Sequence, residues 1–166
     1  MKLAFARERL GQILPEAFAL WQAHWEETEG YRAGQGFQPN LEQYVQLDET
    51  GQFVEFTARN EAGQLVGHLG FILHMSRHTC RPNAVEDYFY LAPEARKGLN
   101  AVSLLRFAVN WLQEAGMAQI GMSSKLTNDI EPLLRRVGFQ YVAKFFVMDV
   151  LEKPNVLRQS KSPDTA

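Results

Sequence analysis

The spacing of apolar residues along the chain predicts a series of strands and helices. Residues 1–10 alternate loosely between apolar and polar positions, which indicates a short strand. From Pro15 to Glu29 the spacing becomes helical, because four large apolar residues share one stripe and Gly30 stands at the C-terminal cap position. The residues of this stripe are Leu14, Phe18, Trp21 and Trp25. After a loop rich in glycine and glutamine, Asn40 is expected to cap a second, short helix that ends at Asp48–Gly51.

Three strands are predicted to follow in succession. Phe53–Arg59 and Leu65–His74 are separated by the turn sequence NEAGQ, in which Gly63 is available for a positive φ, so these two strands form an antiparallel hairpin. Ala84–Leu91 is rich in aromatic residues and reads as a strand until Pro93 ends it.

The C-terminal half alternates helices and strands. The predicted elements are a helix over Asn100–Ala115, a strand over Gln119–Ser123, a helix over Thr127–Val137 and a long strand over Phe139–Leu151. The strands on either side of the first of these helices should be parallel, joined by a right-handed crossover, and the earlier strands antiparallel. The fold class is therefore α/β with a mixed sheet, in a single domain over residues 1–151. Residues 152–166 show no periodicity and are expected to form a flexible tail.

Composition narrows the class of protein. The 17 Lys and Arg residues nearly balance the 19 Asp and Glu residues, which argues against a nucleic-acid partner. The only cysteine, Cys80, excludes an intramolecular disulfide and a cysteine-based zinc cluster, and we expect no metal site. The chain has no apolar run of the length that a signal sequence or a membrane span requires. We expect a soluble cytoplasmic protein that does not bind membranes.

One loop carries the chemistry of a phosphate site. Arg96, Lys97 and Gly98 precede a helix whose first turn contains no acidic residue, so free backbone amides, a positive dipole end and two cations come together. The alternative is that these two cations are ordinary solvated loop residues. The loop is neither a Walker A sequence nor a dinucleotide-binding fingerprint, which disfavours nucleoside triphosphates and NAD.

The chain resembles the Gcn5-related N-acetyltransferases, which transfer an acetyl group from acetyl-CoA to an amine. The resemblance rests on LAPEARKGLNAVSLLRFAVNWLQEAG, residues 91–116, and on LLRRVGFQYVAKFFVMDV, residues 133–150. It implies a mainly antiparallel sheet flanked by helices, with a V-shaped opening between two parallel strands. Within the superfamily, the run Y-L-x-P-E-x-R-x-G is similar to small acetyltransferases encoded by bacteriophages, which would make a host protein an expected acceptor. The sequence leaves open whether the acceptor amine belongs to a protein lysine, an N-terminus or a small metabolite.

The resemblance also assigns expected roles at individual positions. Leu91 matches the strand position whose backbone N–H stabilises the oxyanion of the thioester carbonyl. The residues that match the CoA pyrophosphate loop are Arg96, Lys97, Gly98, Leu99, Asn100 and Ala101. The glycine comes one residue early, with Leu99 in the expected glycine position. Asn128 lies one place from the asparagine at which family members contact CoA.

A general base must remove a proton from the acceptor amine, because an ammonium is not a nucleophile. Glu86 and Asp87 are the candidates, and strand alternation places Asp87 on the face of Phe89 and Leu91, opposite Glu86. Only one of the two acids can then face the site, and Asp87 is the preferred base. His74 is a third candidate.

The family's usual general acid is missing. A tyrosine commonly lies four residues before the glycine of the last Gly-Phe, and this chain has Leu134 there. Tyr141, water or unassisted departure of the thiolate are the alternatives. The same gap supports a second hypothesis, a binding or inhibitor module on the acetyltransferase scaffold that acts on a partner protein and has lost turnover.

Overall fold

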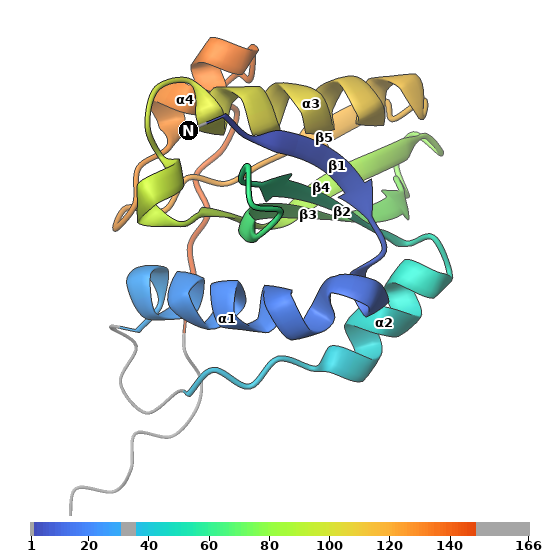
Figure 1. The fold of residues 1–166 in the computed structure, drawn as a ribbon. Helices are drawn as coiled ribbons and strands as arrows, with labels where there is room; N and C mark the ends of the chain where they lie inside the picture. The colour runs from blue at the N-terminus through green and yellow to red at the C-terminus, as the bar shows by residue number, and fades with distance from the viewer. Residues whose placement is uncertain (1, 31–35, 149–166) are drawn as a thin grey trace, which may run out of the picture.

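The computed structural model describes residues 2–30 and 36–148, which form three layers. A central sheet lies between two helices on one side and two on the other (Figure 1). The strands are β1 (Ala4–Glu8), β2 (Phe53–Arg59), β3 (Leu65–Met75), β4 (Pro82–Leu91) and β5 (Gln119–Gly121). The helices are α1 (Leu10–Thr28), α2 (Leu41–Glu49), α3 (Asn100–Glu114), α4 (Glu131–Val137) and the short 3₁₀ turn η1 (Pro93–Ala95).

The strand order in the sheet is β1-β2-β3-β4-β5. The first four strands are antiparallel, whereas β5 runs parallel to β4 after the crossover through α3. The mixed α/β prediction is confirmed. The predicted hairpin turn is also present, because Gly63 has φ +81° and the Asn60 carboxamide accepts hydrogen bonds from the amides of Ala62 and Gln64.

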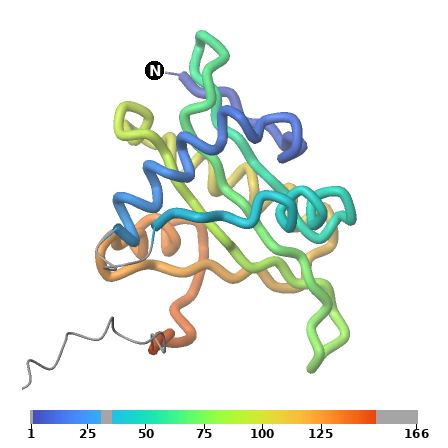
Figure 2. The backbone as a smooth tube through the Cα atoms, turned by 90° about the horizontal axis from the view of Figure 1, so that it is seen from below, coloured from blue at the N-terminus to red at the C-terminus, as the bar shows by residue number. Residues whose placement is uncertain are grey.

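Each face of the sheet buries its own apolar cluster. On the α3 side, Phe56, Phe71 and Leu104 are completely buried, and α1 covers a second cluster that includes Phe53 and Tyr88. Full burial of one such side chain contributes about 1.5–3 kcal/mol. The view from below shows α1, and the segment that leads into α2, crossing this second face (Figure 2).

Helix α1 differs from its prediction. It begins at Leu10 rather than Pro15, and its buried stripe is Leu10, Ile13, Ala17 and Trp21, while Phe18 remains 38% exposed. The reason is a tertiary cap. The buried carboxylate of Asp48, at the end of α2, accepts a hydrogen bond from the amide of Leu10 at 3.2 Å. Asn40 caps α2 as predicted, accepting from the amide of Gln43.

The predicted last helix starts four residues too early. Residues 125–128 form a turn closed by the backbone bridge between Lys125 and Asn128; after it, Ser124 Oγ accepts from the amide of Ile130 and Asp129 accepts from that of Glu131. These two side chains compete with the helix for its first amide groups, and α4 begins at Glu131 with Pro132 in its first turn.

The predicted last strand is wrong over residues 139–148, which form no strand and are exposed almost throughout. Val142, Phe145 and Phe146 are each at least 85% exposed. A strand requires a partner edge, which local alternation of side chains cannot supply. The preceding strand is also shorter than predicted, with β5 ending at Gly121. Residues 149–151 and the predicted tail 152–166 lie outside the described residues.

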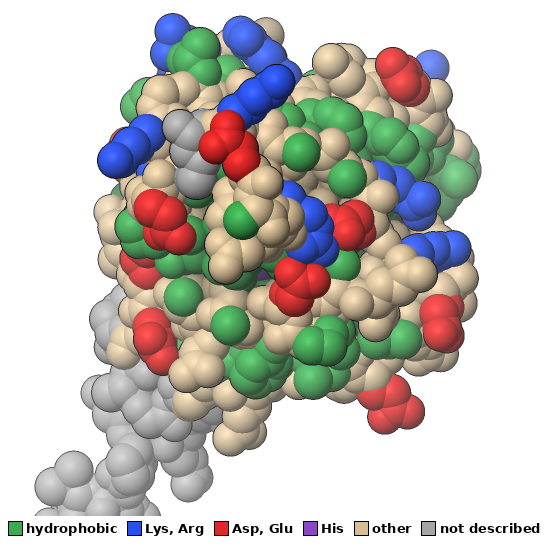
Figure 3. Space-filling model, viewed as in Figure 1, with side chains coloured by type: hydrophobic (Ala, Val, Ile, Leu, Met, Phe, Trp, Pro, Cys, Tyr) green, Lys and Arg blue, Asp and Glu red, His purple; other side chains and the backbone are tan. Residues whose placement is uncertain are grey.

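None of the helices in the described part of the chain combines the length and the apolar character that crossing a membrane demands. On the face shown in Figure 3, positive and negative side chains are interspersed.

Candidate active site

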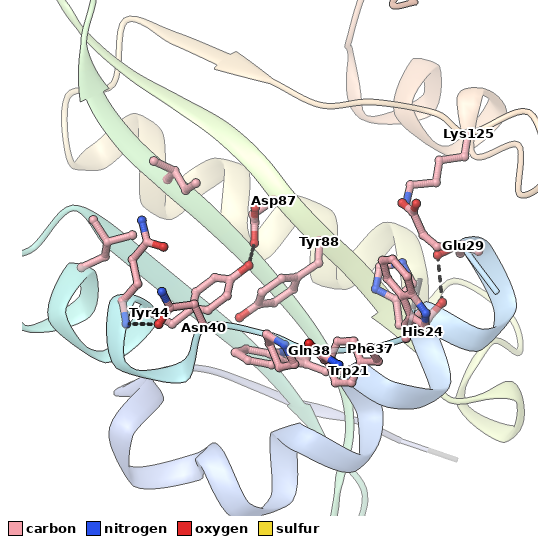
Figure 4. Close-up of a pocket in the computed structure, with 17 residues that line it drawn as sticks. Trp21, His24, Glu29, Phe37, Gln38, Asn40, Tyr44, Asp87, Tyr88 and Lys125 are labelled. Atoms are coloured by element: carbon pink, nitrogen blue, oxygen red, sulfur yellow. Dashed lines mark hydrogen bonds and ion pairs between the residues drawn. The ribbon is translucent and has the colours of Figure 1, made fainter. Parts of the chain in front are cut away.

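A cavity of about 520 Å³ lies between α1, α2 and β4. Five aromatic side chains line it, together with three charged residues and His24 (Figure 4). The aromatic residues are Trp21, Trp25, Phe37, Tyr44 and Tyr88, and the charged ones are Glu29, Asp87 and Lys125. This volume is typical of a site for one small molecule.

Asp87 enters the cavity because of a β-bulge. The β3–β4 register shifts between Gly70, which faces Tyr88, and Phe71, which faces Glu86, so Asp87 has no partner in the ladder. Asp87 therefore lies in the same cavity as Tyr88, whereas simple alternation had placed it on the face of Phe89 and Leu91. That part of the prediction is wrong, because a bulge interrupts the period of two.

The Asp87 carboxylate is held by α2. The Tyr44 hydroxyl donates to Asp87 Oδ2 at 2.5 Å, across 43 residues of sequence. Burial, followed by the neighbouring Asp87 carboxylate, raises the pKa of Tyr44 well above its usual value. The phenol consequently keeps its proton and remains a donor to the carboxylate.

Glu86 has a different environment. Its carboxylate accepts hydrogen bonds from the amide and the hydroxyl of Ser123, just after β5. Burial raises the pKa of Glu86, and the bonds from Ser123 oppose that shift. Glu86 does not line the cavity and instead ties β4 to the segment that follows β5.

The two parallel strands separate after a short contact. β4 pairs with β5 only over Asn83–Val85. Just after β4, the amide of Ala92 donates to the carbonyl of Val66 in β3, so the amide of Leu91 is directed to the opposite edge. Consistently, the Leu91 carbonyl accepts from the Arg96 side chain instead of from β3. The V-shaped opening that the family resemblance implies lies here.

The phosphate-type loop has a defined local structure. Gly98 has φ +64°, and space around its α-carbon is open, so a side chain there would meet strain but no clash. Helix α3 begins directly afterwards with no side-chain cap and no acidic residue in its first turn. The side chain of Asn100 donates to the carbonyl of Ala95 and closes the loop.

Arg96 is engaged within the chain. Its guanidinium bonds to Glu27 of α1 at 2.6 Å, to the Leu91 carbonyl at 2.8 Å, and lies over the Tyr90 ring. The bond to Glu27 raises the pKa of Arg96 further above its usual value. Of the two predicted phosphate cations, Arg96 therefore braces the loop against α1, while Lys97 is exposed next to Gly98.

The other predicted residues lie apart from the cavity. Asn128 sits in the turn before α4, bridged to Lys125 through its backbone. His74 is exposed near the end of β3 and does not line the cavity. Tyr141 is exposed in the segment that forms no strand, and Leu134 is buried against α3.

Of the described residues that line the cavity, only Asp87 is a predicted site residue, and the other ionisable ones are Tyr44, Tyr88, His24, Glu29 and Lys125. His24 stacks on Tyr90, and burial lowers its pKa to about 4, so the imidazole is neutral at pH 7. Glu29 forms an ion pair with Lys125, 96 residues away. The sequence offers one signal for these residues: His24 lies between Trp21 and Trp25 on the helical stripe predicted to be apolar, where a histidine is unexpected.

A buried polar cluster lies directly beneath the aromatic wall. Trp21 Nε1 donates to His68 Nδ1 at 2.9 Å, and the Tyr88 hydroxyl donates to Glu55 at 2.6 Å. Burial raises the pKa of Glu55 to about 8 and lowers that of His68 to about 3. Although His68 and Glu55 lie 3.6 Å apart, neither is predominantly charged at pH 7, so this contact is not a salt bridge. The cluster fixes two rings of the cavity.

Comparison with known proteins identifies the fold. No family model matches the sequence, and no curated protein does. Among solved structures, an aminoglycoside acetyltransferase from an uncultured soil metagenomic sample matches with a TM-score of 0.69 and 18% identity, over 90% of this chain and 99% of that one. The fold is that of the Gcn5-related N-acetyltransferases.

Two further structures have the same fold. Ribosomal-protein-alanine N-acetyltransferase from Brucella melitensis has a TM-score of 0.65 and 14% identity, over 89% of this chain and 99% of its own. A predicted acetyltransferase from Clostridium acetobutylicum, solved with acetyl-CoA, has a TM-score of 0.65 and 15% identity, over 92% and 99%.

Proposed function

We propose that this protein is an N-acetyltransferase that moves an acetyl group from acetyl-CoA to a primary amine in a ternary complex. One observation carries the proposal. The edge of β4 that opens at Leu91 and the carboxylate of Asp87 in the cavity belong to one strand, four residues apart. A donor held at the opening and an acceptor held in the cavity would thus meet along β4.

The residues around the opening suit a CoA donor. The uncapped first turn of α3 offers backbone amides and a positive dipole end to a pyrophosphate, and the open space at Gly98 permits close approach. Lys97 adds a solvent-exposed cation, and the amide of Leu91 is positioned to stabilise the oxyanion that develops on the acyl carbonyl.

In the proposed acetyl transfer, water carries the proton from the acceptor to the general base. Four strand residues span about 13 Å, so the ammonium proton travels from the acceptor to Asp87 through water. The amine nitrogen then bonds to the acyl carbon while the carbon–sulfur bond breaks. The leaving thiolate takes its proton from solvent, since Leu134 provides no hydroxyl.

The decisive experiment measures release of free CoA thiol on mixing the protein with acetyl-CoA and an amine panel. Because Cys80 is exposed and would itself react with thiol reagents, the assay uses Cys80→Ser protein. Release that requires both amine and protein supports the proposal. Absence of acetyl-CoA binding in calorimetry at micromolar protein overturns it.

Leu134 favours one other function, a binding or inhibitor module on this scaffold. Its apolar side chain is 93% buried and replaces the family's usual proton donor. That alternative predicts CoA or amine binding with no thiol release for any acceptor. A separate part of the proposal is that the protein comes from a bacteriophage and acetylates a host protein. An assay for acetylation of intact host proteins would test it.

A further inference from the structure

Aromatic rings form a large part of the cavity wall. The ring of Trp21 lies 4.9 Å from that of Tyr44 and 5.2 Å from that of Tyr88, and Trp25 lies 6.1 Å from Phe37. Two of these rings are held from below, Trp21 by His68 and Tyr88 by Glu55. Rings fixed in this way present a preformed surface against which another flat ring packs.

The charge of the lining is small. The ionic groups among the described residues of the lining are Asp87, Glu29 and Lys125, and Glu29 forms an ion pair with Lys125. His24 adds no charge at pH 7, because burial lowers its pKa to about 4. Among the described residues that line the cavity, Asp87 is therefore the one carboxylate without a cationic partner. A polycation would bring several charges into a site with one such carboxylate, and each additional desolvated charge is unfavourable.

We propose that the cavity selects a primary amine with one positive charge on an aromatic or apolar body, of the arylalkylamine class. This inference rests on the proposed function and names its acceptor class. It separates the chain from its structural neighbours that are aminoglycoside acetyltransferases, whose named substrates are polycationic.

Asp87 and the rings divide the recognition between them. In Figure 4 the Asp87 carboxylate lies beside Tyr44 and Tyr88, whereas the Glu29–Lys125 pair lies beyond Tyr88. The ammonium faces the Asp87 carboxylate through water, along the proton path proposed above, and cation–π contacts with the rings of Tyr44 and Trp21 add attraction for it. The body of the acceptor packs between Trp21 and Phe37.

Calorimetry without acetyl-CoA tests the class directly. The probes are 2-phenylethylamine, spermidine and kanamycin, at about 0.15 M salt, which screens diffuse attraction. We expect 2-phenylethylamine to bind about tenfold or more tightly than either polycation. Equal or tighter binding of spermidine or kanamycin overturns the inference.

Substitutions at Phe37 and Lys125 test the aromatic packing and the charge of the lining separately. Phe37→Ala should weaken 2-phenylethylamine about fivefold, and Phe37→Tyr, which keeps the ring, should restore it. Lys125→Met removes one positive charge from the lining and keeps the Glu29 carboxylate, so the ratio of p-xylylenediamine affinity to benzylamine affinity should rise about tenfold. An unchanged ratio, or an unchanged affinity in Phe37→Ala, contradicts the assignment.

Failure of this inference and failure of the proposed function give different results. If thiol release occurs with polyamines but not with arylalkylamines, acetyl transfer stands and the acceptor class is wrong. If arylalkylamines bind as expected but release no thiol when acetyl-CoA is added, the acceptor class stands and the transferase proposal is wrong.

Discussion

The hydroxyl of Tyr44 lies 2.5 Å from the carboxylate of Asp87 and joins α2 to the bulge of β4 inside the cavity. Because the Tyr44 hydroxyl keeps its proton, it remains a hydrogen-bond donor that orients the carboxylate. Asp87 is also the one acid of its pair that lines the cavity, since Glu86 is bonded to Ser123.

The two adjacent acids form a matched pair of variants. Asp87→Asn should lower kcat for the acceptor amine by about 10²–10⁴-fold, the usual contribution of a positioned general base. Glu86→Gln keeps an acceptor for Ser123 and serves as the control, with kcat within about threefold of wild type on the same reasoning. Steady-state thiol release measures both. Equal losses in the two variants would remove Asp87 as the base.

Three buried titratable side chains make folding stability depend on pH in both directions. Glu55 has a folded pKa of about 8, above its ordinary 4.5, so its stabilising effect is lost as pH rises from 4.5 to 8. His24 and His68 have folded pKa values of about 4 and about 3, below the ordinary 6.5, so stability is lost as pH falls below 6.5. Denaturant unfolding should give maximum stability near the ordinary histidine pKa of about 6.5.

Glu55→Gln isolates the alkaline side of that profile. The carboxamide retains an acceptor for Tyr88 but does not ionise, so the decline above pH 6.5, about 1.4 kcal/mol per pH unit in the limit, should disappear. Urea titrations at pH 6.5 and 8 measure it. A wild-type protein equally stable at both values would show that Glu55 is not protonated in the folded state.

Two substitutions at Gly98 distinguish the effect of added charge on CoA binding from the effect of backbone strain. Gly98→Ala and Gly98→Glu both place a side chain at φ +64°, which costs about 1 kcal/mol in each. Only Gly98→Glu adds a carboxylate, and it should weaken CoA binding about tenfold relative to Gly98→Ala. Calorimetry with CoA compares the two. Indistinguishable affinities would place the pyrophosphate elsewhere.

Arg96 and Lys97 should separate into a structural and a binding role. Arg96→Met loses its bonds to Glu27 and the Leu91 carbonyl and should lower the free energy of unfolding by about 1–2 kcal/mol. Lys97→Met should leave stability within about 0.5 kcal/mol and reduce both CoA affinity and its salt dependence. The reverse pattern in thermal unfolding and calorimetry would contradict this division.

Local sequence determined much of the fold. The turn at Asn60 and Gly63 is closed by hydrogen bonds within a five-residue segment. Asn40 caps α2 by accepting a hydrogen bond from the amide three residues later in the sequence. Neighbouring residues alone were sufficient to predict β2 from its alternation, α3 from its helical period, and the loop that ends at the start of α3. Asp87 was recognisable as a candidate base because a carboxylate on a strand before that loop is a local pattern.

Only the tertiary structure decided which groups meet in the site. Three features of the site depend on which elements pack together. They are the bulge at Asp87, the hydrogen bond to Asp87 from Tyr44, which is 43 residues away in the sequence, and the ion pair between Arg96 and Glu27, which are 69 residues apart. The early start of α1 requires Asp48, and residues 139–148 keep a strand-like pattern without forming a strand. Turns, caps and periodicity are satisfied by neighbouring residues, whereas strand partners, ion pairs and burial require a second surface, whose position no local pattern specifies.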